Sequence, residues 1–586
     1  MKKVLNTPET LVLEMCNGIA MAHPELELIS KYRILKKKEI DKQKVTLISG
    51  GGSGHEPAHA GFIGKGMLDA AVCGDVFASP SQIQVYQAIK ATASDKGTLL
   101  IIKNYSGDIM NFQNAAFLAE TDGLAVDYVK VDDDIAVEDS LYTVGRRGVA
   151  GTVLVHKIAG AAAEKGLSLP EVKKAAEKAA QNVRSLGFAL TSCTVPTKGA
   201  PTFELAENEM EFGVGIHGEP GIKREKMVSA DELAEKMLPA LLADLQIEAG
   251  KSEEIALLVN GFGATPLMEL YVLNNSIVRE LSKRNVTIHR VLVGNYMTSI
   301  DMAGASVSIM KLDEELKSLL DAPSDTPALK ITGEAGETIY RDVFANDEQV
   351  DSASFAVETD EAYANVSGEV ISLDNMVYLI DKMSEVIIQN EVPFCDLDAH
   401  AGDGDFGMSI AKGFRQLKRE WPHVLREGTD IGRFLDSCSI VIMEYCGGAS
   451  GPIWGFAFKS AAKSAMGKTE LDVSAFADMM QAAVQGIQTV GERSFGRGAV
   501  VGDKTLIDAL VPCADAWTAG AKAGILMKDA FEKGAVAAVD GAKKTENIVA
   551  RMGRAGAVGE RSLGYPDAGA HALGVIFTAL SKSLEF

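Results

Sequence analysis

The hydrophobic pattern changes near residue 370, and this change constrains the fold more than any other feature of the chain. Before it, short apolar runs alternate with helix-like stretches, which predicts an α/β fold with a largely parallel sheet. The expected strands are Val45–Ser49, Leu99–Ile102, Ile255–Val259 and Val291–Val293, and the expected helices include Leu169–Leu186 and Ala230–Leu245. After Val370, apolar residues recur at helical spacing, as in DNMVYLIDKMSEVIIQN and FADMMQAAVQGIQTV. This periodicity predicts an all-helical domain.

The segment from about 322 to 368 is acidic, weakly periodic and contains two prolines, which is typical of a linker or peripheral segment. A break within SLGFALTSCTVPTKGAPTF, near 185–200, divides the α/β part into two lobes. A chain of 586 residues, 47% of them hydrophobic, is long enough for two to four domains. The expected organisation is an α/β domain over 1–330 with lobes at about 1–185 and 186–330, a linker over 331–368, and a helical domain over 369–586.

Composition excludes several classes of function. A net charge of −22 argues against a nucleic-acid partner, because binding a phosphate backbone needs a basic face. The seven cysteines form no CxxC pair, which argues against a zinc site or a disulfide framework and favours a cytoplasmic protein. Pro8, Glu9 and Glu14 interrupt the N-terminal segment, so we expect no signal peptide. No apolar run of membrane-spanning length occurs, so we expect no membrane span.

The stretch DAHAGDGDFG places Asp398, Asp403 and Asp405 in one glycine-kinked loop. Carboxylate oxygens are the ligands that Mg²⁺ prefers, usually shared with substrate phosphates. An EF-hand that begins at Asp403 would need a glutamate where Phe414 stands, so this alternative fails. Helix capping also uses aspartate, but three carboxylates with two glycines exceed what a cap requires. The stretch predicts a magnesium site.

Three other glycine-rich stretches fall between the helical runs. CGGASGPIWG, at 446–455, could present backbone N–H groups to a phosphate, although close helix packing explains it equally well. GAVVGDKT, at 498–505, is not a P-loop, because Asp503 separates Gly502 from Lys504 and no strand precedes it. GRAGAVGERSLGYPDAGA, at 553–570, is either a solvated surface loop or a functional loop whose polar residues contact a nucleotide.

In the first half, polar residues follow two expected strands. GGGSGHEP, at 50–57, places His55 after the first, and KNYSGDIMNF, at 103–112, supplies Lys103 and Asp108 after the second. Because ligands bind at the carboxyl ends of such strands, these loops could meet over one pocket, with His55 and Asp108 as acid–base candidates. GVGIHGEPG sets His217 between glycines. An isolated histidine is more often structural than catalytic, but the flanking glycines would let a ligand approach closely.

These motifs, together with FASPS, GNYMTSIDMAG, GGASG and GDKTLIDALVP, resemble the single-chain, ATP-dependent dihydroxyacetone kinases over nearly the whole chain. The resemblance implies a two-lobed α/β substrate domain followed by an eight-helix barrel that binds Mg·ATP. It implies that His217 captures the ketose carbonyl as a hemiaminal, that Asp108 accepts the hydroxyl proton and that His55 assists. The implied substrate residues are Gly52, Ser53, Gly54, His55, Lys103, Asp108 and His217. The implied metal ligands are Asp398, Asp403 and Asp405. The implied nucleotide contacts are Phe406, Gly407, Met408, Ser409, Ala449, Ser450, Thr505, Leu506, Arg561, Asp567, Ala568 and Gly569.

The sequence departs from the family pattern at Phe406, Tyr565 and Ala568 and over 556–558, so its adenosine contacts could differ. The leading hypothesis is phosphorylation of dihydroxyacetone by ATP. The alternatives are an erythrulose kinase, an FMN-cyclising side activity and a non-catalytic ketose sensor. The intact aspartates argue against the sensor, and the fusion of both domains in one chain argues against a phosphoprotein-dependent enzyme. Relatives in this family are often homodimers, so we expect a homodimer.

Overall fold

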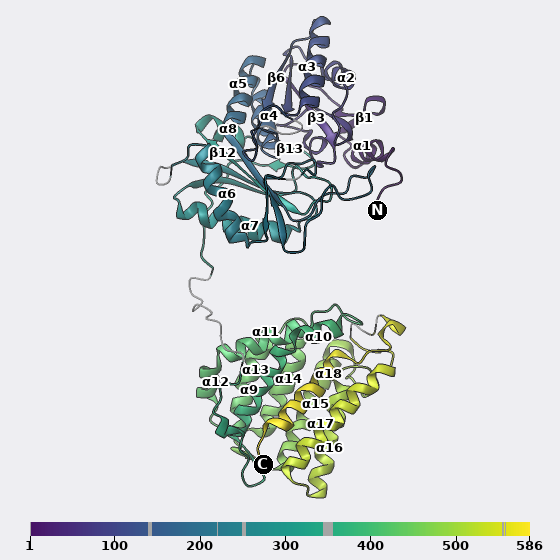
Figure 1. The fold of residues 1–586 in the computed structure, drawn as a ribbon, viewed down its shortest axis with the longest axis vertical. Coiled ribbons are helices and arrows are strands. Elements are labelled where there is room, and N and C mark those ends of the chain that lie inside the picture. Colours follow the sequence, from purple (N-terminus) through teal and green to yellow (C-terminus); the bar gives the residue numbers. More distant parts are fainter. Residues whose placement is uncertain are drawn as a thin grey trace. The chain divides into compact units, whose positions relative to one another are not determined.

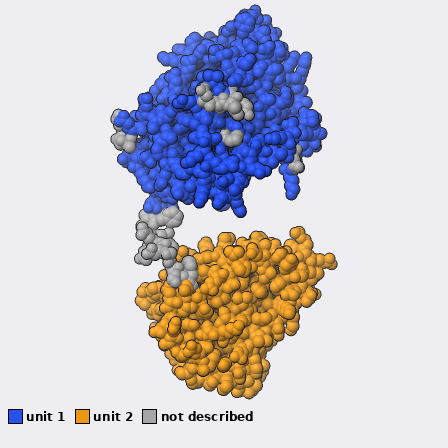
Figure 2. Space-filling model, viewed as in Figure 1, with its two compact units in different colours: residues 1–343 blue, residues 344–586 orange. Residues whose placement is uncertain are grey.

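The computed structural model describes residues 2–138, 143–219, 221–248, 253–343, 356–553, 556 and 558–586. The chain divides into two compact units, Met1–Val343 and Phe344–Phe586, coloured separately in Figure 2. The boundary falls within the segment that the sequence predicts as a linker, of which 344–355 lies outside the described residues. Each unit is considered by itself below.

The first lobe of the α/β unit is built on a six-stranded sheet of order β1-β2-β4-β3-β5-β6 (Figure 1). Its strands are β1 (Leu26–Ile29), β2 (Ile34–Lys37), β3 (Thr46–Ser53), β4 (Ala70–Val76), β5 (Thr98–Lys103) and β6 (Val126–Val131). Strands β4, β3, β5 and β6 run parallel, while β1 and β2 pair antiparallel at one edge. The parallel prediction is confirmed for the central strands of this lobe.

Helices cover both faces of this sheet, so its central strands are buried. On one face lie α2 (Gln82–Thr92) and α3 (Ser106–Thr121), which pack on Ile48, Leu100 and Ile102. On the other lie α1 (Leu11–Ala22), α4 (Thr152–Glu164) and α5 (Leu169–Gln181), around Leu47 and Leu99. Burial on both faces explains why β3 and β5 are continuous apolar runs in the sequence.

The second lobe has a sheet of order β11-β10-β12-β7-β8-β9, and here the parallel prediction is wrong. Its strands are β7 (Val183–Ala189), β8 (Glu209–Phe212), β9 (Lys223–Lys226), β10 (Glu254–Gly261), β11 (Thr287–Gly294) and β12 (Gly304–Leu312). Only β10 and β11 are parallel. The link between β11 and β12 spans only 295–303, which is too short for the helical crossover that would bring β12 back parallel to β11 and β10. One face packs on α6 (Ala230–Asp244) and α7 (Leu267–Lys283), and the other on the first lobe.

One predicted helix is too long. The expected helix Leu169–Leu186 is α5, which ends at Gln181, and β7 begins at Val183. Asn182 ends the helix, and the residues that follow pair antiparallel with β12. The segment Val183–Ala189 therefore forms a strand because it pairs with β12. Local periodicity does not predict such a tertiary contact.

The second unit confirms the predicted all-helical barrel. Within the described residues, eight long helices form a closed ring in which each contacts the next and the last returns to the first. These are α9 (Leu373–Gln389), α11 (Phe406–Arg419), α13 (Ile431–Tyr445), α14 (Ser450–Ala465), α15 (Val473–Phe495), α16 (Ile507–Ala523), α17 (Met527–Lys544) and α18 (Ala568–Ser583). Two shorter helices, α10 (Glu391–Asp398) and α12 (Trp421–Glu427), join members of the ring (Figure 1).

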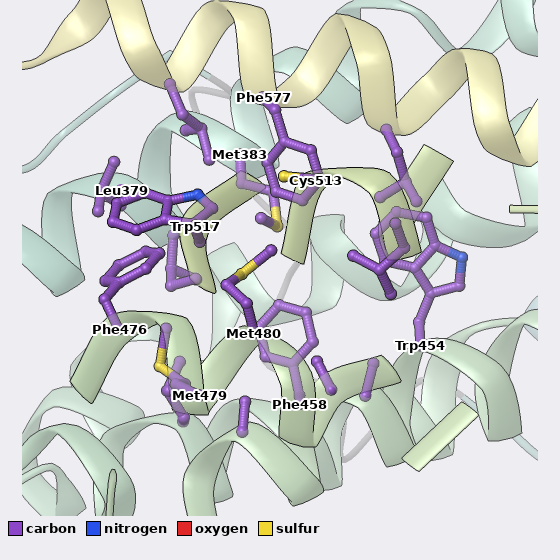
Figure 3. Close-up of a pocket in the computed structure, with 18 of the residues that line it drawn as sticks. Leu379, Met383, Trp454, Phe458, Phe476, Met479, Met480, Cys513, Trp517 and Phe577 are labelled. Carbon is purple, nitrogen blue, oxygen red and sulfur yellow. The ribbon is translucent and has the colours of Figure 1, made fainter. Parts of the chain in front are cut away.

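The middle of the ring is apolar. Side chains such as Met383, Phe476, Met480 and Trp517 point into the space between the helices, and a cavity of about 130 Å³ remains among them (Figure 3). The lining residues that the structure describes carry no charge, so this cavity offers nothing that could hold a phosphate or a metal. Among the described helices, none combines the length and the hydropathy that crossing a bilayer requires.

Candidate functional site

The α/β unit brings together three of the residues that the sequence singles out after strands β3 and β5. His55 follows the end of β3, Lys103 ends β5, and Asp108 lies in the first turn of α3. Lys103 Nζ lies 3.3 Å from Asp108 Oδ2, and the Ser79 hydroxyl donates to the other carboxylate oxygen. All three predicted residues are buried, with His55 and Lys103 at 0% exposure. The carboxyl ends of adjacent parallel strands thus form one polar cluster.

His217 reaches this cluster from the other lobe, in the loop between β8 and β9. Its Nε2 lies 3.3 Å from Nε2 of His55. His55 Nδ1 lies 2.9 Å from the carbonyl oxygen of Thr298. Because a carbonyl can only accept, neutral His55 carries its proton on Nδ1, and its Nε2 faces His217 as an acceptor. The two imidazoles are held as a pair by elements of both lobes.

Aromatic rings surround the His217 imidazole. The centroid of the Tyr105 ring lies 4.5 Å from that of the His217 imidazole, and the centroid of the Phe77 ring lies 5.2 Å from it, both in edge-to-face geometry. Burial, together with the positive charges of Lys103 and Arg147, lowers the pKa of His217 to about 3. Burial, His217 and Lys103 likewise hold the pKa of His55 well below its ordinary value. Both imidazoles are therefore neutral at physiological pH, and a neutral imidazole is a nucleophile.

The glycine turn that precedes His55 must lack side chains. Gly51 and Gly54 have φ of +152° and +109°. A Cβ on Gly51 would lie 2.5 Å from Lys103 Nζ, and one on Gly54 would lie 2.9 Å from the Phe77 ring. Gly52 and Ser53 are the last residues of β3, where the Ser53 hydroxyl donates to the carbonyl of Gly74 in β4. The predicted motif therefore lets the backbone approach the polar cluster directly.

The helical unit gathers the three predicted metal ligands. Asp398 ends α10, Asp405 precedes α11, and Asp403 lies between them. One carboxylate oxygen from each lies within 4.8 Å of the other two. Gly404 N–H donates to Asp398 Oδ2 at 2.9 Å, which fixes that carboxylate while leaving oxygens facing the group. Three converging hard oxygen ligands fit a magnesium ion.

The carboxylates line a pocket of about 210 Å³ at which four helices begin, namely α11, α14, α16 and α18. Unpaired N–H groups at helix N-termini favour phosphate. Nine predicted nucleotide contacts line the pocket: Phe406, Ser409, Ala449, Ser450, Thr505, Leu506, Asp567, Ala568 and Gly569. Gly407, Met408 and Arg561 are not among its lining residues; Gly407 packs against the Glu391 carbonyl, and Met408 and Arg561 are exposed.

Other lining residues were not predicted as contacts. The rings of His400 and Tyr565 stack at 3.7 Å between centroids. Lys504 donates to the carbonyls of Thr545 and Tyr565, both at 2.7 Å, so its ammonium holds two backbone segments together. Burial raises the pKa of Asp567 to about 7. In the sequence, Lys504 follows Asp503 in GDKT, and Tyr565 stands out only as a departure from the family pattern.

Family models match both units. Residues 17–328 match the Dak1 domain, and residues 400–582 match the DAK2 domain. Of 400–582, residues 554, 555 and 557 lie outside the described part of the chain. The first match covers the strands and loops of the α/β site, and the second covers Asp403, Asp405 and the helix ends that line the pocket.

Known relatives match over one or both units. Triokinase/FMN cyclase of Rattus norvegicus is 36% identical, covering 100% of this chain and 99% of its own. L-erythrulose 1-kinase of Mycolicibacterium smegmatis is 34% identical, covering 100% of both. The dihydroxyacetone-binding subunit DhaK of a PTS-dependent dihydroxyacetone kinase of Listeria innocua is 51% identical, covering 56% of this chain and 100% of its own. The crystal structure of the C. freundii dihydroxyacetone kinase with AMP-PNP and Mg²⁺ matches with a TM-score of 0.59 and 30% identity, covering 99% of each chain.

Proposed function

This chain belongs to the family of single-chain dihydroxyacetone and triose kinases that join a Dak1 domain to a DAK2 domain, and we propose that it transfers the γ-phosphoryl group of ATP to the hydroxymethyl group of a short ketose, with dihydroxyacetone as the first candidate. The observation that carries this proposal is the His55–His217 contact of 3.3 Å beside Lys103 and Asp108. A neutral nucleophile, a carboxylate and a buried ammonium together suit a substrate that has both a carbonyl and a hydroxyl.

In the proposed reaction, His217 first captures the substrate. The lone pair of the unprotonated nitrogen of the neutral imidazole adds to the ketone carbon, and the C=O π electrons move to oxygen. That oxygen takes up a proton while the other imidazole nitrogen releases its N–H proton, which gives a neutral hemiaminal. Lys103, next to Asp108, is placed to donate a hydrogen bond to the bound sugar, and Nε2 of His55, next to His217, is placed to accept one. Glycerol has no electrophilic carbon, so this capture would discriminate against it.

Asp108 is the candidate base for the second step. Its carboxylate would accept the proton of the substrate hydroxyl while that oxygen attacks the γ-phosphorus and ADP leaves. Ser79 and Lys103 hold the two carboxylate oxygens, which fixes the direction in which the base faces. A base held in one orientation shortens the search for a reactive geometry.

For the nucleotide, Asp398, Asp403 and Asp405 would hold Mg²⁺, because their oxygens already converge. When bound, the metal would neutralise the charge that develops on the transferred phosphoryl group. The N-termini of α11, α14, α16 and α18 would receive the phosphates. The AMP-PNP and Mg²⁺ in the C. freundii structure support this assignment.

The identity of the ketose stays open between two candidates. Dihydroxyacetone and L-erythrulose, the latter phosphorylated by the M. smegmatis relative according to its name, share a hydroxymethyl ketone end. His217 and Asp108 would contact this shared end, so both sugars suit the same two steps. Any preference for one of the two sugars depends on how the site contacts the part of the sugar on the other side of the carbonyl.

The test is an ADP-release assay of the full chain with Mg·ATP against dihydroxyacetone, D- and L-erythrulose, D-glyceraldehyde and glycerol, with the product identified by phosphorus NMR. Turnover of one or more ketoses, none of glycerol, and loss of ketose turnover in His217→Ala are expected. ADP release that does not depend on a carbonyl substrate, or ketose capture without turnover, would contradict the kinase. Formation of cyclic FMN is measured in parallel, because the rat relative is also named an FMN cyclase.

A further inference from the structure

Arg147 is one of the most deeply buried large side chains of the α/β unit, at 2% exposure, and it lies outside every motif discussed above. Its guanidinium donates in three directions. Nε bonds Asp134 Oδ2 at 2.7 Å, Nη1 bonds Glu219 Oε1 at 2.9 Å, and Nη2 bonds the Gly213 carbonyl at 2.9 Å. Burying a charge is costly unless its partners are exact in number and direction, and these three are on two different segments.

Glu219 connects this guanidinium to the backbone of His217. One of its oxygens accepts from Arg147, and the other accepts from the His217 N–H at 2.9 Å. Because Arg147 also holds the Gly213 carbonyl, both ends of the segment 213–219 are tied to one guanidinium. The imidazole of His217 is carried between these two fixed points.

The backbone at Gly215 leaves room for this arrangement. A Cβ there would lie 1.9 Å from Glu219 Oε1 and 2.8 Å from Arg147 Nη1. The carboxylate therefore lies directly against the Gly215 main chain, and any side chain at this position would displace it. The second glycine of GVGIHGEPG, Gly215, is therefore explained by a contact with Arg147, which is distant in sequence.

The segment that carries Arg147 is itself fixed to the end of β5. The Asn104 side-chain amide, next to Lys103, donates to the carbonyls of Val144 and Arg146 at 3.0 and 2.7 Å. Arg147 is therefore held at a set distance from Lys103 on one side and from His217 on the other. The network joins the two lobes at the candidate site.

We propose that Arg147 and Glu219 are positioning residues, which hold the segment 213–219 so that the His217 imidazole stays against His55 and can capture a ketose carbonyl. This inference rests on the proposed function, because the step that it serves is the addition of His217 to the substrate. Holding a nucleophile in a reactive orientation lowers the barrier to addition. Loss of the clamp should therefore weaken carbonyl capture more than it slows transfer from a saturated site.

The first test is Glu219→Gln in the full chain. The amide has a single acceptor oxygen, so it cannot accept from both His217 and Arg147 as the carboxylate does. We expect the KM for the ketose to rise about 10- to 100-fold, the range for loss of a charge-assisted hydrogen bond, with kcat at saturating ketose within about threefold of the parent. Capture is measured separately, by carbon-13 NMR of a ketose labelled at its carbonyl carbon, as the fraction in tetrahedral form.

A second variant tests whether the planar fork or only the charge matters. Arg147→Lys keeps one positive charge but cannot donate in three fixed directions. We expect Arg147→Lys to weaken capture of the ketose relative to the parent chain, as Glu219→Gln does. The matched control is Asp244→Asn, which breaks the bidentate Arg146–Asp244 pair one residue along the chain, at 2.9 and 2.7 Å. That pair does not include the segment 213–219, so ketose KM and capture should match the parent.

The outcomes separate this inference from the proposed function. If the parent chain captures and phosphorylates ketose while Glu219→Gln and Arg147→Lys keep capture and KM within about twofold, the positioning role is overturned and the kinase stands. Asp244→Asn could weaken capture as much as Glu219→Gln does, with the same loss of thermal stability. In that case the Arg147–Glu219 pair only stabilises the fold, and the inference fails. A parent chain that neither captures nor phosphorylates any ketose overturns both.

Discussion

The two units place their polar residues in opposite environments. In the α/β unit, His55, Lys103 and Asp108 are almost completely buried, and burial keeps the imidazoles neutral. In the helical unit, Asp398 and Asp405 are half-buried and Asp403 is exposed at the mouth of a pocket formed by helix ends. The comparison teaches that each environment suits the charge of its proposed ligand. An uncharged carbonyl can be captured by a neutral base in a dry pocket, whereas a polyanion with its metal needs carboxylates that stay ionised.

The same comparison assigns each part of the reaction to one unit. Ketose capture should depend on the α/β unit, and nucleotide binding on the helical unit. A change that affects one should leave the other measurable in the same full-length chain.

His217→Ala should lower kcat/KM for the ketose by about 10³- to 10⁴-fold, because it removes the proposed nucleophile. Binding of Mg·AMP-PNP, measured by calorimetry, should stay within about twofold of the parent. His23→Ala, at a half-buried histidine of α1's C-cap, serves as the control and should leave turnover unchanged. Ketose turnover within tenfold of the parent in His217→Ala would remove covalent capture from the proposal.

Asp403→Asn should lower Mg²⁺-dependent turnover by about 10²- to 10³-fold, because one of three converging carboxylates loses its charge. The carbon-13 signal of the captured ketose should persist, since that site lies in the α/β unit. Asp396→Asn changes an exposed carboxylate of α10, the helix that ends at Asp398; Asp396 is not part of the group, so this change should have little effect. Equal losses in the two variants would point to general electrostatics rather than to metal binding.

The sequence predicts these sites to different depths. Strands β3 and β5 and the loops after them were predictable, because buried apolar runs followed by glycine and polar residues mark the carboxyl ends of parallel strands. The mostly antiparallel second sheet was not, because a buried strand has the same apolar pattern in either direction. Arg147 was missed for a different reason: its contacts with Glu219 and Gly213 join segments about 70 residues apart, and no local spacing encodes them.

The convergence of Asp398, Asp403 and Asp405 was predictable, because the three aspartates fall within eight residues and their approach depends on local geometry alone. The pairing of His55 with His217 could not be derived from spacing, since it joins two lobes across 162 residues of sequence. The resemblance to a family supplied the role of His217. Residues that complete the site from a distance, such as Tyr105 and Thr298, required the folded structure.

A smaller effect concerns stability in the helical unit alone. Lys504→Met should destabilise it by about 2–4 kcal/mol, because the buried carbonyl of Thr545 and the partly buried carbonyl of Tyr565 would each lose a charge-assisted hydrogen bond. Lys528→Met, at an exposed lysine of α17, is the matched control and should change stability by less than about 0.5 kcal/mol. Urea unfolding followed by tryptophan fluorescence reports this unit, since all three tryptophans of the chain lie in it. If both variants lose the same free energy of unfolding, Lys504 does not stabilise the unit through its bonds to Thr545 and Tyr565.

The smallest expected effect is an absence of pH dependence in ketose capture. The pKa of His217 is lowered to about 3, so the imidazole stays neutral as pH falls from about 8 to about 5, and affinity for the ketose should change less than about twofold.

The unfolded chain, with an ordinary histidine pKa near 6.5, binds a proton that the folded chain does not between about pH 6.5 and pH 3. Stability of the α/β unit should therefore fall as pH falls through that window, while capture by the remaining folded protein persists. Carbon-13 titration of the captured ketose checks the first point and thermal unfolding the second. Loss of capture with a midpoint near 6.5 would mean that the His217 imidazole is hydrated, and the contrast between a dry ketose site and a wet nucleotide site would fail.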